Sequence, residues 1–195
     1  MEMTIKADDE QLRKSKSAKL ILLFAMVSMT MMFAGLTSAF VVSKSRADWL
    51  KDFELPSAFY YSTAVIIGCS ITFYLAKRAI QKDKRSEVTA LLLGTLALGV
   101  LFVVLQFQGF GQIVEKGYYF TGQGSSITTT FLYVVTVTHL LHLAGGLISL
   151  LIIIYNHFKQ KYNSTQTLGI ELGAMYWHFL DLLWVYLFLF LYFFK

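Results

Sequence analysis

Long apolar stretches alternate with short charged stretches along the chain. Asp, Glu, Lys and Arg are absent between Lys19 and Lys44, Glu54 and Lys77, Glu87 and Glu115, and Lys116 and Lys159. A helix rises about 1.5 Å per residue, so about 20 apolar residues cross the roughly 30 Å hydrocarbon layer of a membrane. Each of the four stretches is long enough, and the pattern predicts a membrane-spanning helix in each.

A fifth apolar stretch ends the chain and contains two polar residues, His178 and Asp181. Its other residues are almost all apolar or aromatic, which favours a fifth span. The fold class is therefore all-α, a polytopic membrane bundle, with a polar cytoplasmic tail (1–19) before a single membrane domain (20–195). The predicted spans are residues 20–43, 56–77, 87–109, 128–156 and 171–194.

Composition excludes several other classes of protein. Of the 195 residues 56% are hydrophobic and only 15% are charged, whereas about 25% are charged in an ordinary soluble domain. A single cysteine excludes a disulfide framework and a zinc site built from cysteines. The net charge of +5 comes from residues placed between the apolar stretches, which favours a membrane surface over nucleic acid as the partner.

The distribution of Lys and Arg predicts the orientation of the bundle. The side that holds the N-terminus carries 12 of them, against 5 on the other side. Because positive charges stay on the cytoplasmic side, the N-terminus is predicted inside and the C-terminus outside. The cluster Lys77, Arg78, Lys82, Lys84 and Arg85 dominates this count; it is interpreted as a topology signal, with lipid binding as the alternative.

The connections between spans are short, so consecutive helices should be antiparallel neighbours. Small residues four apart allow helices to approach closely in lipid. Such pairs occur at Gly35/Ala39, Thr95/Gly99 and Gly145/Ser149.

Ionisable side chains at membrane depth are costly, so they mark the candidate site. His139 and His142 share one face of the fourth helix, and His178 and Asp181 have the same spacing in the fifth. Glu171 lies nearly beneath His178, seven residues earlier. Helix rise places Asp181 and His142 at similar depths, about 15 and 20 Å from the inner ends of their helices, which allows a contact between them. These ionisable residues are interpreted either as a site for a proton or a lipid headgroup, or as a hydrogen-bonded cluster with a structural role.

Two aromatic residues flank this cluster. Trp177 and Trp184 stand four residues before and three after Asp181, and they either enclose the cluster or serve as ordinary packing residues. If Asp181 joins the helices, replacing it with Asn should weaken the packing of the bundle. The lone Cys69 is interpreted as a small hydrophobic packing residue.

Haem binding and transport are the two alternative hypotheses for this chain. A bis-imidazole haem needs His residues on facing helices, and His142 with His178 could supply one such pair. His157 is predicted in the inner loop beyond the membrane. A transporter would need inverted repeats or broken helices, and the single proline, Pro56, stands where a helix starts.

Two motifs lie in the last two helices. The fourth helix carries His-x-x-His followed by glycine, at His139, His142 and Gly146. The last helix carries the pattern aromatic–Trp–His–Phe–x–Asp–x–x–Trp, at Tyr176, Trp177, His178, Phe179, Asp181 and Trp184. Both motifs resemble those of subunit III of the haem–copper respiratory oxidases. The resemblance covers the chain from about residue 20 and points to the five-helix bacterial form.

This resemblance implies an accessory, non-redox subunit of an enzyme complex that reduces dioxygen to water and pumps protons. Haem and copper would lie in partner subunits, and this chain would pack directly on subunit I beside subunit II, within the bacterial cytoplasmic membrane. It would hold structural phospholipid and support proton uptake, and the complex could join a respiratory supercomplex. A quinol oxidase and a relative associated with nitric oxide reductase are the alternatives within this class.

One position departs from the family pattern. The family usually has an acidic residue directly after a serine in the first of these helices, whereas Met29 follows Ser28 here. Any role of that acid in proton uptake is therefore not transferred to this chain.

Overall fold

Five long helices make up the protein. The computed structural model describes residues 2–50, 53–122, 125–163 and 166–194. The helices are α1 (Glu2–Val42), α2 (Ser57–Ile80), α3 (Arg85–Glu115), α4 (Ile127–Phe158) and α5 (Leu168–Phe194), with a short 3-10 helix, η1 (Ser43–Ser45), after α1. All five are long and apolar enough to cross a membrane. The predicted all-α bundle with five spans is confirmed, and each helix extends past its predicted span at one end or both.

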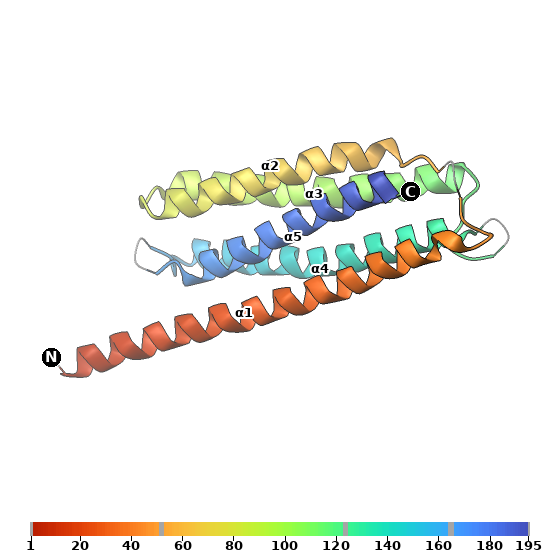
Figure 1. Cartoon of the computed structure of the whole chain (residues 1–195). Helices are drawn as coiled ribbons and strands as arrows, with labels where there is room; N and C mark the ends of the chain where they lie inside the picture. The colour runs from red at the N-terminus through yellow and green to blue at the C-terminus, as the bar shows by residue number, and fades with distance from the viewer. Residues whose placement is uncertain (1, 51–52, 123–124, 164–165, 195) are drawn as a thin grey trace.

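The helix α1 includes most of the segment predicted as a tail. It begins at Glu2 and runs without a break to Val42, so the polar segment continues the first span as helix. Its N-terminal part projects beyond the ends of the other helices (Figure 1). Arg13, Lys14 and Lys16 are exposed along this part.

The helix α5 occupies the centre of the arrangement. It packs against α1, α2 and α4, while α2 pairs closely with α3, and α4 contacts α3 and α1. In Figure 1 α5 runs between the α2–α3 pair and the α1–α4 pair. Residues on several faces of α5 therefore contact residues of different helices. This central position explains why many of the buried polar and aromatic residues belong to α5.

Three helix ends share one geometry. After α3, Gly117 has φ of 81°, and the N–H of Tyr118 donates to the carbonyl of Ile113 at 3.2 Å. Asp83 after α2 and Gln160 after α4 adopt the same left-handed conformation, with φ of 54° and 57°. This ending satisfies the last carbonyl groups of a helix and reverses the chain. The pairs α2–α3, α3–α4 and α4–α5 are in contact, as the short connections predicted. The prediction is wrong for the first pair, because α1 packs on α5 and α4 rather than on α2.

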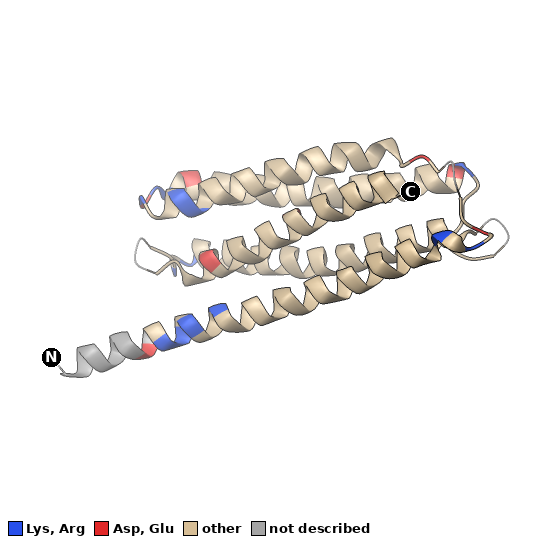
Figure 2. Cartoon of the chain, in the orientation of Figure 1, with Lys and Arg blue, Asp and Glu red and all other residues tan. Residues whose placement is uncertain are grey.

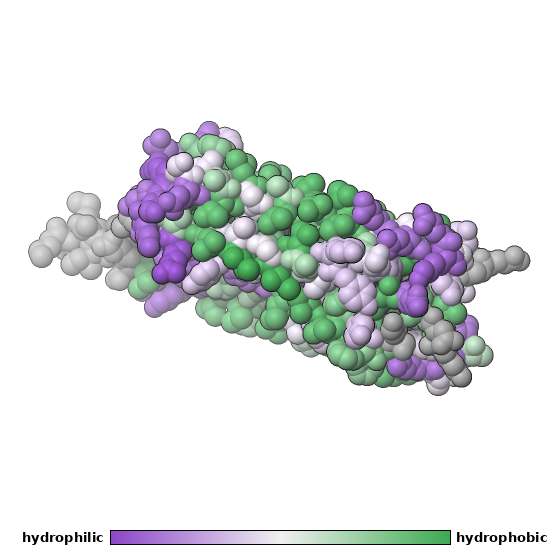
Figure 3. All heavy atoms as spheres, turned by 90° about the horizontal axis from the view of Figure 1, so that it is seen from above, coloured by the Kyte–Doolittle hydropathy of each residue, from purple (hydrophilic) through white to green (hydrophobic). Residues whose placement is uncertain are grey.

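The surface divides into an apolar belt and two charged ends. Charged residues gather at the two ends of the bundle (Figure 2), and the middle of the surface is largely apolar (Figure 3). Ile21, Phe24 and Leu182 are each 70% or more exposed within this belt. Apolar side chains so exposed suit a hydrocarbon environment and would be costly in water.

The α2–α3 pair has one very close contact. A Cβ atom added at Gly109 of α3 would lie 2.7 Å from Cδ1 of Phe59 on α2 and closer still to Cε1. Phe59 is fully buried, and its ring has edge contacts with Phe110 and Trp184 at centroid distances of 6.3 and 5.8 Å. Only a glycine leaves room for the ring at this position.

Candidate polar site in the bundle interior

Asp181 and His178 lie where α5 faces α2. The Oγ of Ser70 and Nδ1 of His178 are 2.6 Å apart and form a hydrogen bond between the two helices. Asp181 is only 4% exposed and faces Cys69 and Ser70 of α2. Within the described residues neither carboxyl oxygen of Asp181 has a hydrogen-bond partner. The contact with His142 that the depth comparison allowed is therefore not formed.

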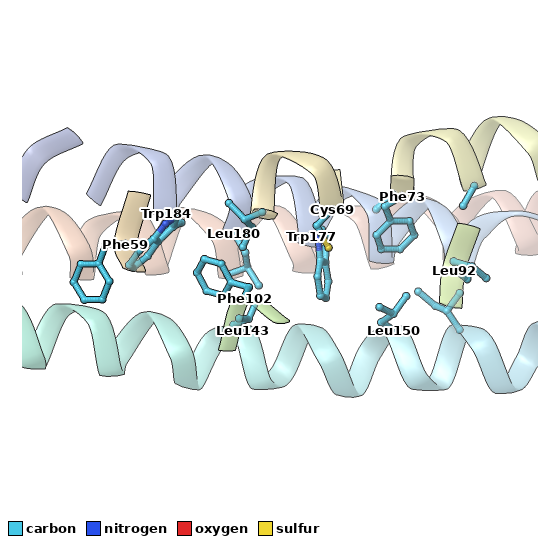
Figure 4. Packing of buried hydrophobic residues seen from close by; sticks show 14 of the residues in the cluster. Phe59, Cys69, Phe73, Leu92, Phe102, Leu143, Leu150, Trp177, Leu180 and Trp184 are labelled. Carbon is cyan, nitrogen blue, oxygen red and sulfur yellow. The ribbon is translucent and has the colours of Figure 1, made fainter. Parts of the chain in front are cut away.

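Trp184 joins three helices on one side of Asp181. Its Nε1 donates to Oγ1 of Thr63 on α2 at 3.0 Å. Its ring lies 5.2 Å from that of Phe102 on α3 and 5.1 Å from that of His139 on α4, measured between centroids. Figure 4 shows Phe59, Phe102 and Trp184 gathered in this part of the core.

Trp177 fills a slot between α3 and α4 on the other side of Asp181. A Cβ atom at Gly99 would come within 3.2 Å of its ring, and one at Gly146 within 3.4 Å. The predicted close approach of a neighbouring helix at Gly99 is thus confirmed. At Gly35 it is not, because no heavy atom lies within 4 Å of the corresponding position.

The two histidines of α4 share a neighbour on α1. The centroid of the Phe33 ring lies 6.5 Å from that of His139 and 5.8 Å from that of His142, which agrees with the predicted common face. His139 is fully buried, and neither ring nitrogen has a hydrogen-bond partner in the described chain. Nδ1 of His142 bonds to the Thr138 carbonyl one turn earlier, at 2.7 Å. His142 thus contacts α1, whereas His178 contacts α2, so the two do not form the facing pair of the haem reading.

Glu171 lies apart from the other candidate residues, at the end of the bundle. Its Oε2 is 2.8 Å from Nζ of Lys19 on α1, and its Oε1 accepts a hydrogen bond of 2.7 Å from Thr167. The Glu171 side chain is 25% exposed and that of Lys19 is 42% exposed. Glu171 therefore ties the start of α5 to α1 and does not extend the interior cluster.

Several interhelical polar contacts involve residues that the sequence did not identify as partners. Nε2 of Gln106 donates to Oγ of Ser62 at 2.9 Å. Thr72 and Thr95 are hydrogen-bonded at 2.9 Å. The amide of Gln106 was itself a signal, because a polar side chain at membrane depth needs a partner. The hydroxyl residues gave little signal, because they are common in membrane helices.

His157 was predicted in a loop beyond the membrane, and this prediction is wrong. It lies in the last turn of α4 and is 7% exposed. Its Nε2 is 2.9 Å from Oγ1 of Thr89 on α3. The helix continues past the predicted end because the residues around His157 still pack on α3.

The chemistry of the interior is that of hydrogen bonds and aromatic packing. Within the described ranges no group of three or more His, Cys, Asp and Glu side chains could hold a metal ion. Cys69 is buried, and its Sγ donates to the Thr95 carbonyl at 3.2 Å, in line with its predicted packing role. The arrangement can join helices and hold a buried carboxyl group.

An apolar groove runs along α1 where this helix diverges from α4 and α5. Its volume is about 690 Å³. The groove continues at Tyr162 and Gly169 into a hollow of about 580 Å³ at the end of the bundle. Side chains of α1, α4 and α5 line the apolar part, among them Ala18, Ile21, Ala25, Ile153 and Tyr176.

Comparison with known proteins identifies the family. A family model described as cytochrome c oxidase subunit III matches residues 2–195. The chain is 30% identical over 140 residues to a cytochrome c oxidase subunit 3 from Spodoptera frugiperda, covering 72% of this chain and 89% of that sequence. It is 31% identical over 143 residues to the protein of that name from Petromyzon marinus, covering 73% of this chain and 51% of the relative. With the Anopheles gambiae protein of the same name, 31% identity extends over 72% of this chain and 50% of the relative.

The chain thus spans about half the length of the latter two relatives and most of the first. Five membrane-spanning helices, the motif residues gathered around α5 and a match along nearly the whole sequence all agree. This multi-pass membrane protein belongs to the cytochrome c oxidase subunit III family.

Proposed function

We propose that the chain is an accessory, non-redox subunit of a haem–copper terminal oxidase. The family match over residues 2–195 is the observation that carries the proposal. In this role the chain packs on the catalytic subunit I, beside subunit II, and the haem and copper belong to those partners. The complex reduces dioxygen to water and pumps protons, and it could join a respiratory supercomplex.

The physical role is to stabilise the catalytic subunit in the membrane. A rigid bundle with a largely apolar flank can cover a neighbouring subunit and keep the neighbour's polar groups away from lipid. Three features support rigidity here: the Trp177 slot, the contact between Phe59 and Gly109, and the bond from Trp184 to Thr63.

Two further parts of the proposal concern lipid and protons. The apolar groove beside α1 has room for an acyl chain of a structural phospholipid, since its volume lies within the about 300–1,000 Å³ usual for small-molecule sites. For protons, the support is the buried Asp181 next to the pair formed by Ser70 and His178. These residues would assist proton uptake by subunit I without taking part in electron transfer.

The location proposed is a bacterial cytoplasmic membrane with the N-terminus inside. The excess of Lys and Arg on one side supports this orientation, and the resemblance to the five-helix form supports the bacterial assignment. The relatives named above come from animals, so the assignment stays a prediction. Cysteine substitutions at exposed Lys82 and Lys116, labelled from either side of the membrane, test the orientation.

Co-purification tests the proposed function directly. The full chain, tagged at its C-terminus and expressed in its own host, is isolated in mild detergent, and the accompanying subunits are identified by mass spectrometry. We expect subunits I and II of a terminal oxidase, together with a haem absorption band from the complex. After the chain is separated from its partners, this band should remain with subunit I.

Two outcomes would refute the proposal. One is a chain that purifies without any oxidase subunit. The other is a haem band that stays with the separated chain, because it would indicate a membrane b-type cytochrome instead. A tagged membrane protein of another family from the same host controls for nonspecific capture.

A further inference from the structure

The turn between α2 and α3 forms a small basic hollow at one end of the bundle. Its volume is about 420 Å³. Figure 2 shows charged residues where these two helices meet. We call this hollow the hairpin pocket, and it is lined by Leu75, Arg78, Ala79, Lys82, Lys84, Glu87 and Leu91.

The basic cluster of this turn divides into two groups with different surroundings. Lys77 is partly buried and its charge acts on Glu171 of α5. Arg85 is exposed but does not line the pocket. The other three, Arg78, Lys82 and Lys84, are exposed and line the pocket.

The charge of the pocket favours an anionic ligand. Three basic side chains and one acidic side chain line it. The acidic one, Glu87, pairs with Lys84 at 2.7 Å, and both side chains are more than half exposed. The lining therefore keeps two positive charges in excess, carried mainly by Arg78 and Lys82.

An apolar stripe leads from the pocket along the outer face of α2. Ile67, Ile71 and Leu75 follow one another at intervals of four residues, which places them on one helix face. They are 48%, 55% and 42% exposed. A ligand that combines a negative head with an apolar tail fits both features, whereas a free phosphate would use only the first.

We propose that the hairpin pocket binds the headgroup of an anionic phospholipid. The phosphate group lies between Arg78 and Lys82, and one acyl chain follows Ile71 and Leu75 along α2. Basic pockets between membrane helices bind headgroups of this kind. This site is separate from the groove beside α1, and its existence does not depend on the oxidase partners.

Lipid retention in nanodiscs tests the proposal. The full chain, in the complex with which it purifies, is placed in phosphatidylcholine nanodiscs with increasing amounts of phosphatidylglycerol, and native mass spectrometry counts the retained phosphatidylglycerol. The test variant is the triple change R78Q/K82Q/K84Q. The matched control, R13Q/K16Q/K159Q, removes the same kinds and number of charges at the same end of the bundle, outside any pocket described above.

The expected loss follows from the number of charges removed. Each basic side chain at an anionic surface strengthens binding about fivefold. The test variant should therefore weaken phosphatidylglycerol binding between about 25-fold and about 125-fold. The lower value holds if Lys84, which is already paired with Glu87, adds nothing to binding. The control should change it less than about threefold at this site.

Competition with inorganic phosphate identifies the ligand class. We expect phosphate at millimolar concentration to leave the bound phosphatidylglycerol in place, because phosphate makes no contact with the apolar stripe. Equal retention by the test and control variants would overturn the proposal, and so would displacement of the lipid by phosphate. A circular dichroism spectrum matching that of the unchanged chain verifies that the test variant is folded.

Discussion

The contact between Gly109 and the ring of Phe59 gives a direct test of how α2 and α3 pack. We predict that Gly109→Ala destabilises the chain, because the added methyl group would meet ring carbons at 2.7 Å or less. The ring has no free space in which to retreat, since Phe59 is fully buried between Phe110 and Trp184. The ring or the whole helix must therefore shift.

Gly111 provides the matched control on the same helix. No heavy atom lies within 4 Å of a Cβ atom placed there, so Gly111→Ala adds only the helix-propensity gain of up to about 1 kcal/mol. The same gain applies at Gly109, where overpacking opposes it with about 1–3 kcal/mol. The difference between the two variants cancels the propensity gain and leaves the overpacking cost of about 1–3 kcal/mol.

Unfolding in mixed micelles measures this difference. The purified chain in a mild detergent is titrated with sodium dodecyl sulfate, and the free energy of unfolding is obtained from the loss of near-ultraviolet circular dichroism. The double variant with Phe59→Leu should lose part of the Gly109→Ala penalty, since the flexible side chain can yield. If Gly109→Ala is as stable as Gly111→Ala, the close packing of α2 on α3 inferred here is incorrect.

Three further predictions use the same titration. Trp184→Phe should lower the free energy of unfolding by about 1–2 kcal/mol, because the hydrogen bond from Nε1 to Thr63 is lost. Thr63→Val should lower it by a similar amount. If Trp184→Phe leaves the free energy of unfolding unchanged, this hydrogen bond does not contribute to stability. Ser126→Ala should cost about 1 kcal/mol by removing the cap that accepts from the backbone N–H of Thr129 at 3.2 Å, and an unchanged free energy would argue against the cap. Asp181→Asn should leave the isolated chain equally or more stable, because a buried carboxylate without a hydrogen-bond partner in the described chain is costly. A loss above about 1 kcal/mol would instead support the joining role that the sequence suggested.

Hydrophobic patterning predicted the helices well because a membrane imposes a minimum apolar length on each of them. Helix ends were less predictable. The helix α4 continues to Phe158 because His157 packs on Thr89, a tertiary contact that periodicity does not contain. Likewise α1 starts at Glu2, where polar composition alone favoured a separate tail.

The sequence identified the residues of the candidate site better than it identified the contacts between them. Spacing placed His139 and His142 on one face, and both meet Phe33. The rotation of each helix about its own axis depends on packing against all its neighbours, which spacing within a single helix does not encode. For this reason the sequence allowed a contact between Asp181 and His142, whereas Asp181 faces α2.

The unbroken course of α1 has a mechanical consequence. Its 41 residues extend about 60 Å, twice the roughly 30 Å thickness of the hydrocarbon layer. A stiff rod of this kind behaves as a lever whose pivot is its crossing with α4 and α5. A change of about 10° in its tilt about a point midway along the helix would move its N-terminal end through about 5 Å. A tilt of the membrane-embedded half would thus be transmitted to the polar N-terminal half as a movement of similar size.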